Sequence, residues 1–190
     1  TNDEMQELAM KMMPLLSEHS NSISLNEALF ARIKAVYDQR ESANLTGEQL
    51  QLLQDIYNGF ARGGANLQGE QKEKYRELSQ KLSLLTLQFS ENCLKETNDY
   101  LKVITDSTLL SGLPESAITA AKETAQEKGV EGWAFTLHAP SYVPVMTYAD
   151  NRDLRKEIYM AYNTQCTHDN EYNNLDVVKE LANTRMEVAQ

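Results

Sequence analysis

The stretch from about residue 69 to residue 97 most constrains the fold, because no proline interrupts it and no glycine follows its first position. Its apolar side chains recur every three or four residues, which is the period of an amphipathic α-helix. At about 1.5 Å per residue, such a helix spans on the order of 40 Å. The stretch therefore predicts one long central helix. The residues of its apolar stripe are Tyr75, Leu78, Leu82, Leu85, Phe89, Cys93 and Leu94.

The residues before this stretch carry the same helical period and predict three further helices. Pro14 is expected to kink or split the first of them, near residues 3–19. Ser24 is expected to cap the second helix, with Glu27 three residues later completing a capping box. Thr46 is expected to cap the third.

Residues 99–105 and 132–140 alternate apolar and polar side chains, which is typical of short strands. We expect these two strands to pair. The residues between them, 111–129, have helical period and predict a helix that crosses over or covers the pair.

The sequence HAPSYVPVMTYADNRDLR (138–155) carries two prolines in an otherwise helical region. We expect Pro140 to end the second strand, because proline donates no ladder hydrogen bond. Ser141 then caps a two-turn helix with Pro144 in its first turn, and Asp150 or Asn151 caps the next helix. On these grounds the stretch is a strand-to-helix corner, with the lip of an active site as the alternative interpretation.

The predicted fold class is therefore mainly α: a helical bundle with one long central helix and a small two-stranded β element. Residues 1–190 are expected to form a single helical lobe. Within it, residues 1–98 form a helical bundle, residues 99–140 a strand–helix–strand segment, and residues 141–190 the last helices. The chain starts without methionine and stops within a helical pattern, so we expect it to be a fragment of a longer protein.

The net charge of −10 argues against nucleic-acid binding, because lysine and arginine are not in excess to neutralise phosphates. No apolar run approaches the roughly 20 residues of a membrane span. The first residues are polar and acidic, unlike a signal peptide. These features predict a cytoplasmic protein, or a periplasmic one if a leader has been removed.

The three histidines, His19, His138 and His168, do not form the His-Glu-x-x-His pattern of a common zinc peptidase. The sequence therefore predicts no catalytic residue, no cofactor-binding residue and no metal ligand in this chain. The densest group of metal-ligand residue types is the segment QCTHDNEYNN (165–174), which we interpret as a solvated loop between two helices. A metal-binding or redox role for this group is the alternative. Its members are Cys166, His168, Asp169 and Glu171.

The two cysteines, Cys93 and Cys166, allow one disulfide but no disulfide framework, and we expect buried free thiols. Cys93 lies on the apolar stripe of the long helix, which favours packing over nucleophilic chemistry. The segment ARGGAN (61–66) lacks the lysine and serine or threonine of a phosphate-binding loop, so it is predicted to be a turn. The methionine-rich start is expected to be core that faces a neighbouring helix, with an adaptable contact surface as the alternative. These methionines are Met5, Met10, Met12 and Met13.

Several segments resemble the thimet oligopeptidase-like zinc metallopeptidases, most closely the bacterial peptidyl-dipeptidase (dipeptidyl carboxypeptidase) branch. GLPES and PSYVPVMTYADNRDLR are long enough to make chance agreement improbable. The similar segments occur in family order and cover most of the chain, at residues 14–40, 57–67, 77–97, 110–116, 132–164 and 174–190.

The resemblance implies a largely helical enzyme, several times longer, in which two lobes flank a channel for short peptides. The zinc ligands and the catalytic glutamate of that family lie beyond the similar region. The chain is thus expected to be a non-catalytic N-terminal-region fragment that forms one wall of the channel, inactive alone, with zinc in the parent enzyme. The rest of the same polypeptide is its expected partner. The alternative is a free-standing helical protein-interaction module.

Overall fold

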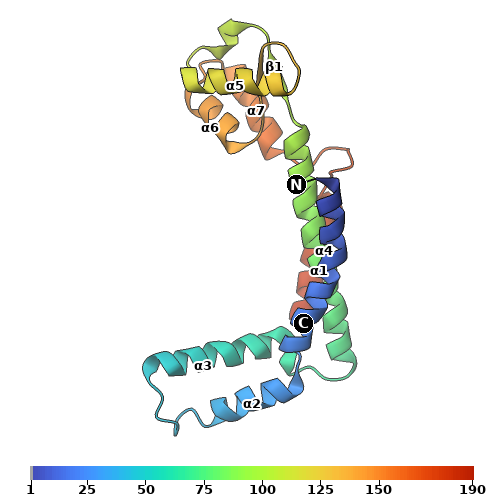
Figure 1. The fold of residues 1–190 in the computed structure, drawn as a ribbon. Coiled ribbons are helices and arrows are strands. Elements are labelled where there is room, and N and C mark those ends of the chain that lie inside the picture. The colour runs from blue at the N-terminus through green and yellow to red at the C-terminus, as the bar shows by residue number, and fades with distance from the viewer. Residues whose placement is uncertain (1) are drawn as a thin grey trace. The chain divides into compact units, whose positions relative to one another are not determined.

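The computed structural model describes residues 2–190, and α-helix dominates them (Figure 1). The predicted fold class, mainly helical with one long helix and a small two-stranded sheet, is confirmed. Among residues 2–190, no helix is both long and apolar enough to cross a membrane. In chain order the α-helices and strands are α1 (Asp3–Ser24), α2 (Glu27–Asp38), α3 (Gly47–Phe60), α4 (Glu70–Asp99), β1 (Lys102–Ile104), α5 (Glu115–Glu127), β2 (Trp133–Phe135), α6 (Ala139–Tyr148), α7 (Arg152–Asn163) and α8 (Leu175–Ala189).

The long helix predicted over residues 69–97 is α4, which has 30 residues and begins directly after Gly69. The chain folds into two compact units, and the boundary between them lies within α4 and within α8. Unit 1 contains the residues up to Leu87 together with Lys179–Gln190, and unit 2 contains Gln88–Val178. The single helical lobe expected over residues 1–190 stays a prediction.

In unit 1, α1 continues to Ser24 and Pro14 does not split it. The predicted cap of the second helix is wrong: Ser24 lies inside α1, and the side chain of Asn26 accepts the backbone N–H of Leu29 at the start of α2. The reason is the burial of Leu25, which is only 2% exposed and anchors the turn between the two helices. Burial of one large side chain thus shifts the boundary by two residues.

Helices α2 and α3 form an antiparallel hairpin in unit 1 (Figure 1). Stacked aromatic rings line it, and the Tyr37 and Tyr57 rings lie 3.9 Å apart. The predicted cap at Thr46 is confirmed: its side chain accepts the N–H of Gln49, and the Gln49 side chain accepts the N–H of Thr46. Where a turn was predicted at 61–66, Ala61–Ala65 form a short π-helix, and Gly64 within it takes a φ of 87°, which favours glycine.

In unit 2, the two predicted strands pair antiparallel, with Val103 opposite Ala134. The predicted helix between them is α5, which packs on β2. Helices α6 and α7 complete a closed apolar core around this sheet. The core consists of Ile104, Leu110, Leu113, Ala121, Phe135, Leu137, Val145, Ala149, Leu154 and Ile158.

The two-proline segment is a strand-to-helix corner, but its helix starts earlier than predicted. Helix α6 begins at Ala139, so Pro140 lies in its first turn rather than at the end of the strand. Proline suits a first turn because the N–H groups there have no partner within the helix, so the missing N–H of proline costs no hydrogen bond. The Ser141 hydroxyl does not cap α6; it accepts the N–H of Thr136 at 3.0 Å. Of the two residues predicted as alternative caps of α7, Asp150 and Asn151, it is Asn151 that caps it.

Candidate functional site

The loop between α7 and α8 (residues 164–174), the α7–α8 loop, is fastened to the C-terminal part of α4 within unit 2. The hydroxyl of Tyr172 donates to the carboxylate of Asp99 at 2.6 Å, and the side-chain amide of Gln165 donates to the hydroxyl of Thr97 at 2.7 Å. Residues 167–171 are exposed, as expected for a solvated loop. Its two ends differ from that expectation, because Cys166 and Asn174 are both 3% exposed.

The backbone of Cys166 is fixed by two hydrogen bonds. Its N–H donates to the carboxylate of Glu96, and its carbonyl accepts the N–H of Asn174 at 2.7 Å. Its φ of 58° lies in the left-handed region, which is unfavourable for a side chain larger than hydrogen. The two backbone bonds hold the residue in that conformation.

The same contacts place both thiols of the chain together. The Sγ atoms of Cys166 and Cys93 lie 3.7 Å apart, and both cysteines are free. The Asn174 side-chain amide contacts one member of the pair: its Nδ2 atom lies 3.5 Å from the Cys93 sulfur and donates to the Phe89 carbonyl at 3.1 Å. Asn92 in turn donates to the Asn174 side chain at 2.8 Å. Both thiols are free, as predicted, but Cys93 is only half-buried, and the proximity of the two thiols was not predicted.

The electrostatics of the pair oppose nucleophilic chemistry at Cys166. Burial raises the pKa of its thiol, and hydrogen bonds to Glu96 and to Cys93 raise that pKa further. A protonated, buried thiol is a poor nucleophile and a poor metal ligand. The ring of His168 lies near other groups: its Nε2 atom is 3.2 Å from the Thr164 hydroxyl and 3.9 Å from the Glu96 carboxylate.

A zinc ion does not fit these residues. Within the part of the chain that the structure describes, no three histidine, cysteine, aspartate or glutamate side chains are grouped so that they could hold a metal ion. His19 and His138 are exposed and lie in different units. That the chain contains no catalytic residue stays a prediction.

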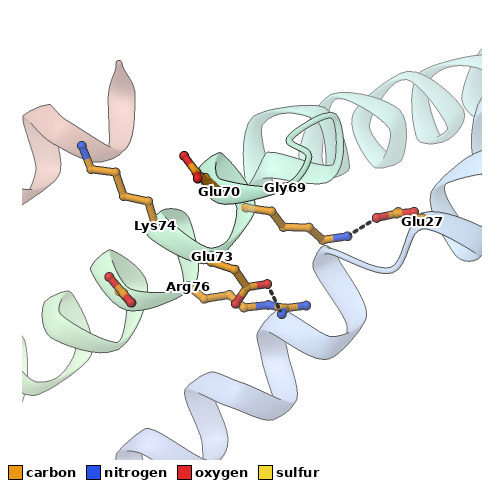
Figure 2. Close-up of a pocket in the computed structure, with 8 residues that line it drawn as sticks. Glu27, Gly69, Glu70, Glu73, Lys74 and Arg76 are labelled. Carbon is orange, nitrogen blue, oxygen red and sulfur yellow. Dashed lines mark hydrogen bonds and ion pairs between the residues drawn. The ribbon is translucent and has the colours of Figure 1, made fainter.

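A shallow charged groove lies in unit 1, where α4 begins beside the α1–α2 turn (Figure 2). Lys72 contributes its ammonium, which donates to the Glu27 carboxylate at 2.6 Å, although only 11% of the Lys72 side chain is exposed. This hydrogen bond, with the lysine charge, lowers the pKa of Glu27. Arg76 pairs with Glu73 at 2.8 Å. Four of the groove's charged side chains thus neutralise one another in two ion pairs. Its charged residues are Glu27, Glu70, Lys72, Glu73, Lys74, Arg76 and Glu77.

Helix α1 presents its more apolar face to solvent. The side turned inward carries Gln6, Ala9, Met13, Ser17 and Asn21, which are buried or half-buried. The prediction that the methionine-rich start is core is therefore wrong for most of it. Helical period shows which residues share a face, but it does not show which face meets a neighbour. Met10 is exposed as well, and the other exposed large apolar residues of the helix, here called the α1 outer face, are Met5, Leu8, Met12, Leu15, Leu16 and Ile23.

Comparison with known proteins bears on the chain as a whole. No family model matches it. Over 98% of its length, the chain is 37% identical to oligopeptidase A of Escherichia coli (strain K12). It is 31% identical over its full length to dipeptidyl carboxypeptidase of the same organism, and 26% identical to the thimet-like oligopeptidase of Dictyostelium discoideum.

The chain is homologous to the oligopeptidase A family. This confirms the family resemblance seen in its segments. The identity with oligopeptidase A, at 37%, exceeds the 31% with dipeptidyl carboxypeptidase. The chain spans about 28% of the length of these oligopeptidase relatives.

Proposed function

We propose that this chain is a non-catalytic, N-terminal-region part of a zinc-dependent oligopeptidase, where it forms one wall of the channel that admits short peptides. The observation that carries the proposal is the alignment of 98% of the chain with 28% of the length of oligopeptidase A. The higher identity with oligopeptidase A favours internal cleavage of short peptides over removal of C-terminal dipeptides. The zinc ion belongs to the remainder of the parent enzyme, and the compartment is the cytoplasm.

The chemistry of the chain agrees with a supporting role. Among residues 2–190, no side chains are grouped to bind zinc, and the Cys166 thiol is held in its protonated form. We expect the purified 190-residue chain to bind no zinc stoichiometrically and to cleave no peptide. Zinc titration and an assay on a short fluorogenic peptide test this. Zinc-dependent turnover by this chain alone would refute the proposal.

The α1 outer face supports the assignment of a partner. Leu15 and Leu16 are 57% and 56% exposed, and water-exposed leucines on one helix face are typical of a surface that a further part of the protein covers. We propose that the remainder of the same polypeptide covers this face.

A charge placed on the α1 outer face tests that partner. Leu15→Asp is expected to destabilise the parent enzyme by at least about 2 kcal/mol, because it buries a carboxylate, and to leave the 190-residue chain nearly unchanged. Lys11→Asp, an exposed polar position on the same helix, is the matched control. Equal thermal stability of Leu15→Asp and the unmodified parent enzyme would argue against a covered face.

A free-standing helical interaction module is the second candidate, and the α1 outer face would serve it equally well. The coding sequence after Gln190 separates the two. A His-Glu-x-x-His motif there is expected if the chain is part of a peptidase, and its absence would favour the module.

We also propose that residues 1–190 behave as one helical lobe. Trp133 is the one tryptophan of the chain and lies on β2 in unit 2, so its fluorescence reports on that unit. Circular dichroism reports on the helices of both units. For a single lobe, the two signals are expected to change at the same urea concentration, and separate transitions would contradict it.

A further inference from the structure

The two cysteines of unit 2 form a closely opposed thiol pair that the proposed function does not use. The sulfurs of Cys93 and Cys166 lie 3.7 Å apart, although 73 positions separate the residues in the sequence. A disulfide joins its sulfurs at about 2.0 Å, so bond formation requires an approach of about 1.7 Å. Rotation of side-chain torsions can supply an approach of that size without a rearrangement of the helices.

The protein holds the two thiols in this position from both sides. Cys93 lies within the regular helix α4, which fixes its backbone. Cys166 lies in a loop, but its N–H and carbonyl are bonded to Glu96 and Asn174, and the Asn174 side chain also reaches the Cys93 sulfur. The proximity of the sulfurs therefore follows from a bonded arrangement and not from a chance contact of mobile side chains.

We propose that Cys93 and Cys166 form an intramolecular disulfide when the protein meets a low-molecular-weight disulfide such as oxidised glutathione, and that this bond staples the α7–α8 loop to α4. The proposal is independent of the oligopeptidase assignment, because it concerns only groups inside unit 2.

The reaction proceeds by two thiol–disulfide exchanges. Cys93, the more exposed of the two, loses its proton and attacks one sulfur of the small disulfide, which forms a mixed disulfide and expels one small thiolate. Cys166 then attacks the Cys93 sulfur, and its thiol proton passes to the Glu96 carboxylate beside it. The raised pKa of Cys166 makes this the slow step, and the 3.7 Å separation of the two sulfurs makes it possible. The second small thiolate leaves. Both thiolates are protonated, so two protein thiols are oxidised and one small disulfide is reduced to two small thiols.

The bond is expected to stabilise unit 2, because it closes a long loop and so restricts the unfolded chain. We expect the unfolding midpoint followed by Trp133 fluorescence to rise by about 10 °C on oxidation and to return on reduction. Backbone amides of residues 167–173 are expected to exchange with deuterium at least about tenfold more slowly in the oxidised chain, since the staple suppresses local opening of the loop.

The test is incubation of the folded chain with oxidised glutathione, followed by mass spectrometry. Because the chain has only two cysteines, any intramolecular disulfide must join this pair. The expected product has lost two hydrogen atoms and yields a Cys93–Cys166 linked peptide after digestion. A stable glutathione adduct, a disulfide-linked dimer, or two free thiols after prolonged incubation would each overturn the proposal. If the disulfide forms but the unfolding midpoint does not rise, the proposal that the bond fastens the α7–α8 loop to α4 is wrong.

Two single variants complete the test. Cys166→Ser removes the resolving thiol, so Cys93 is expected to retain one glutathione. Cys93→Ser leaves only the buried thiol, which is expected to stay free. If either variant fails to fold, the mass and the linked peptide of the unmodified chain still decide the question.

Discussion

Units 1 and 2 both contain many apolar residues, but they differ in how many of these residues are buried. In unit 2, helices α5, α6 and α7 enclose a small sheet, and the core residues around Phe135 and Ile158 are almost completely buried. In unit 1, a leucine- and methionine-rich face of α1 meets solvent, and among its described residues the buried hydrophobic ones are few. They are Leu25, Phe30, Ala65 and Leu181.

The difference teaches that hydrophobic content alone does not indicate a finished core. Unit 2 encloses a core of ten buried apolar residues, although other apolar side chains of this unit, such as Val143 and Leu175, are exposed. Unit 1 has the apolar residues for a further packing layer but not the layer itself, and it also buries the charged Lys72 against Glu27. This contrast agrees with a chain that spans 28% of the length of its relatives.

The largest expected effect comes from matched leucine truncations in the two units. Leu137 is 2% exposed in unit 2, and Leu15 is exposed on α1 in unit 1. Leu137→Ala is expected to lower the free energy of unfolding by about 2–5 kcal/mol, because it leaves a cavity. Leu15→Ala is expected to change it by less than about 0.5 kcal/mol in this chain. Urea unfolding followed by Trp133 fluorescence and by circular dichroism measures both changes in free energy. Equal changes for the two variants would contradict the difference in burial between the two units.

A matched glycine pair sharpens the comparison at the level of the backbone. A Cβ atom at Gly132 in unit 2, where φ is 101°, would lie 2.2 Å from the Ile104 carbonyl oxygen of the paired strand. At Gly69 in unit 1, where φ is 55°, a Cβ would meet nothing within 4 Å. We expect Gly132→Ala to destabilise by about 3 kcal/mol and Gly69→Ala by about 1 kcal/mol, from the left-handed backbone alone. Similar thermal midpoints for the two variants would contradict the close packing of unit 2.

The ion pair of Glu27 and Lys72 tests the polar interior of unit 1. Glu27→Gln is expected to destabilise the chain more than Asp38→Asn, because Lys72 is largely buried whereas Lys34, the partner of Asp38, is half exposed. The lowered pKa of Glu27 gives a contribution to stability that is complete above pH 4.5 and is lost as the pH falls through the lowered pKa. Between pH 3 and pH 6, the thermal unfolding midpoint of Glu27→Gln should therefore fall less steeply with falling pH than that of the unmodified chain. An equally steep fall in both proteins would show that the ion pair does not contribute to stability.

The smallest expected effect is at the surface of unit 2, where Tyr172 holds the α7–α8 loop. Its hydrogen bond to Asp99 raises the pKa of Tyr172 to about 12 from an ordinary value of 10. The folded chain therefore keeps the phenol proton more tightly, so this contribution to stability is complete below pH 10 and is lost as the pH rises toward 12. Tyr172→Phe should be slightly less stable at pH 7 and less sensitive between pH 10 and pH 12. The same alkaline sensitivity in both proteins would show that the bond contributes nothing.

Much of the fold could be predicted from the sequence, because it depends on local patterns. The period of apolar residues set α4 to within two residues, alternation identified both strands, and side-chain caps at Thr46 and Asn151 marked two helix starts. Where prediction failed, at Ser24 and Ser141, a buried Leu25 or a proline in the first helical turn outweighed the local capping preference.

The candidate site could not be predicted in the same way. Sequence marked Cys93 as part of an apolar stripe and Cys166 as part of a polar loop, and nothing local relates residues 73 positions apart. Their contact depends on the path of the chain through β1, α5, β2, α6 and α7, which returns the loop to α4.

By itself, the sequence determined which residues share a helix face, which segments form helices and strands, and to which family the chain is related. Only the tertiary structure decided which faces are buried, because burial depends on what packs against a face and not on its composition. That is why the α1 outer face, apolar in sequence, meets solvent, whereas Lys72, charged in sequence, is enclosed.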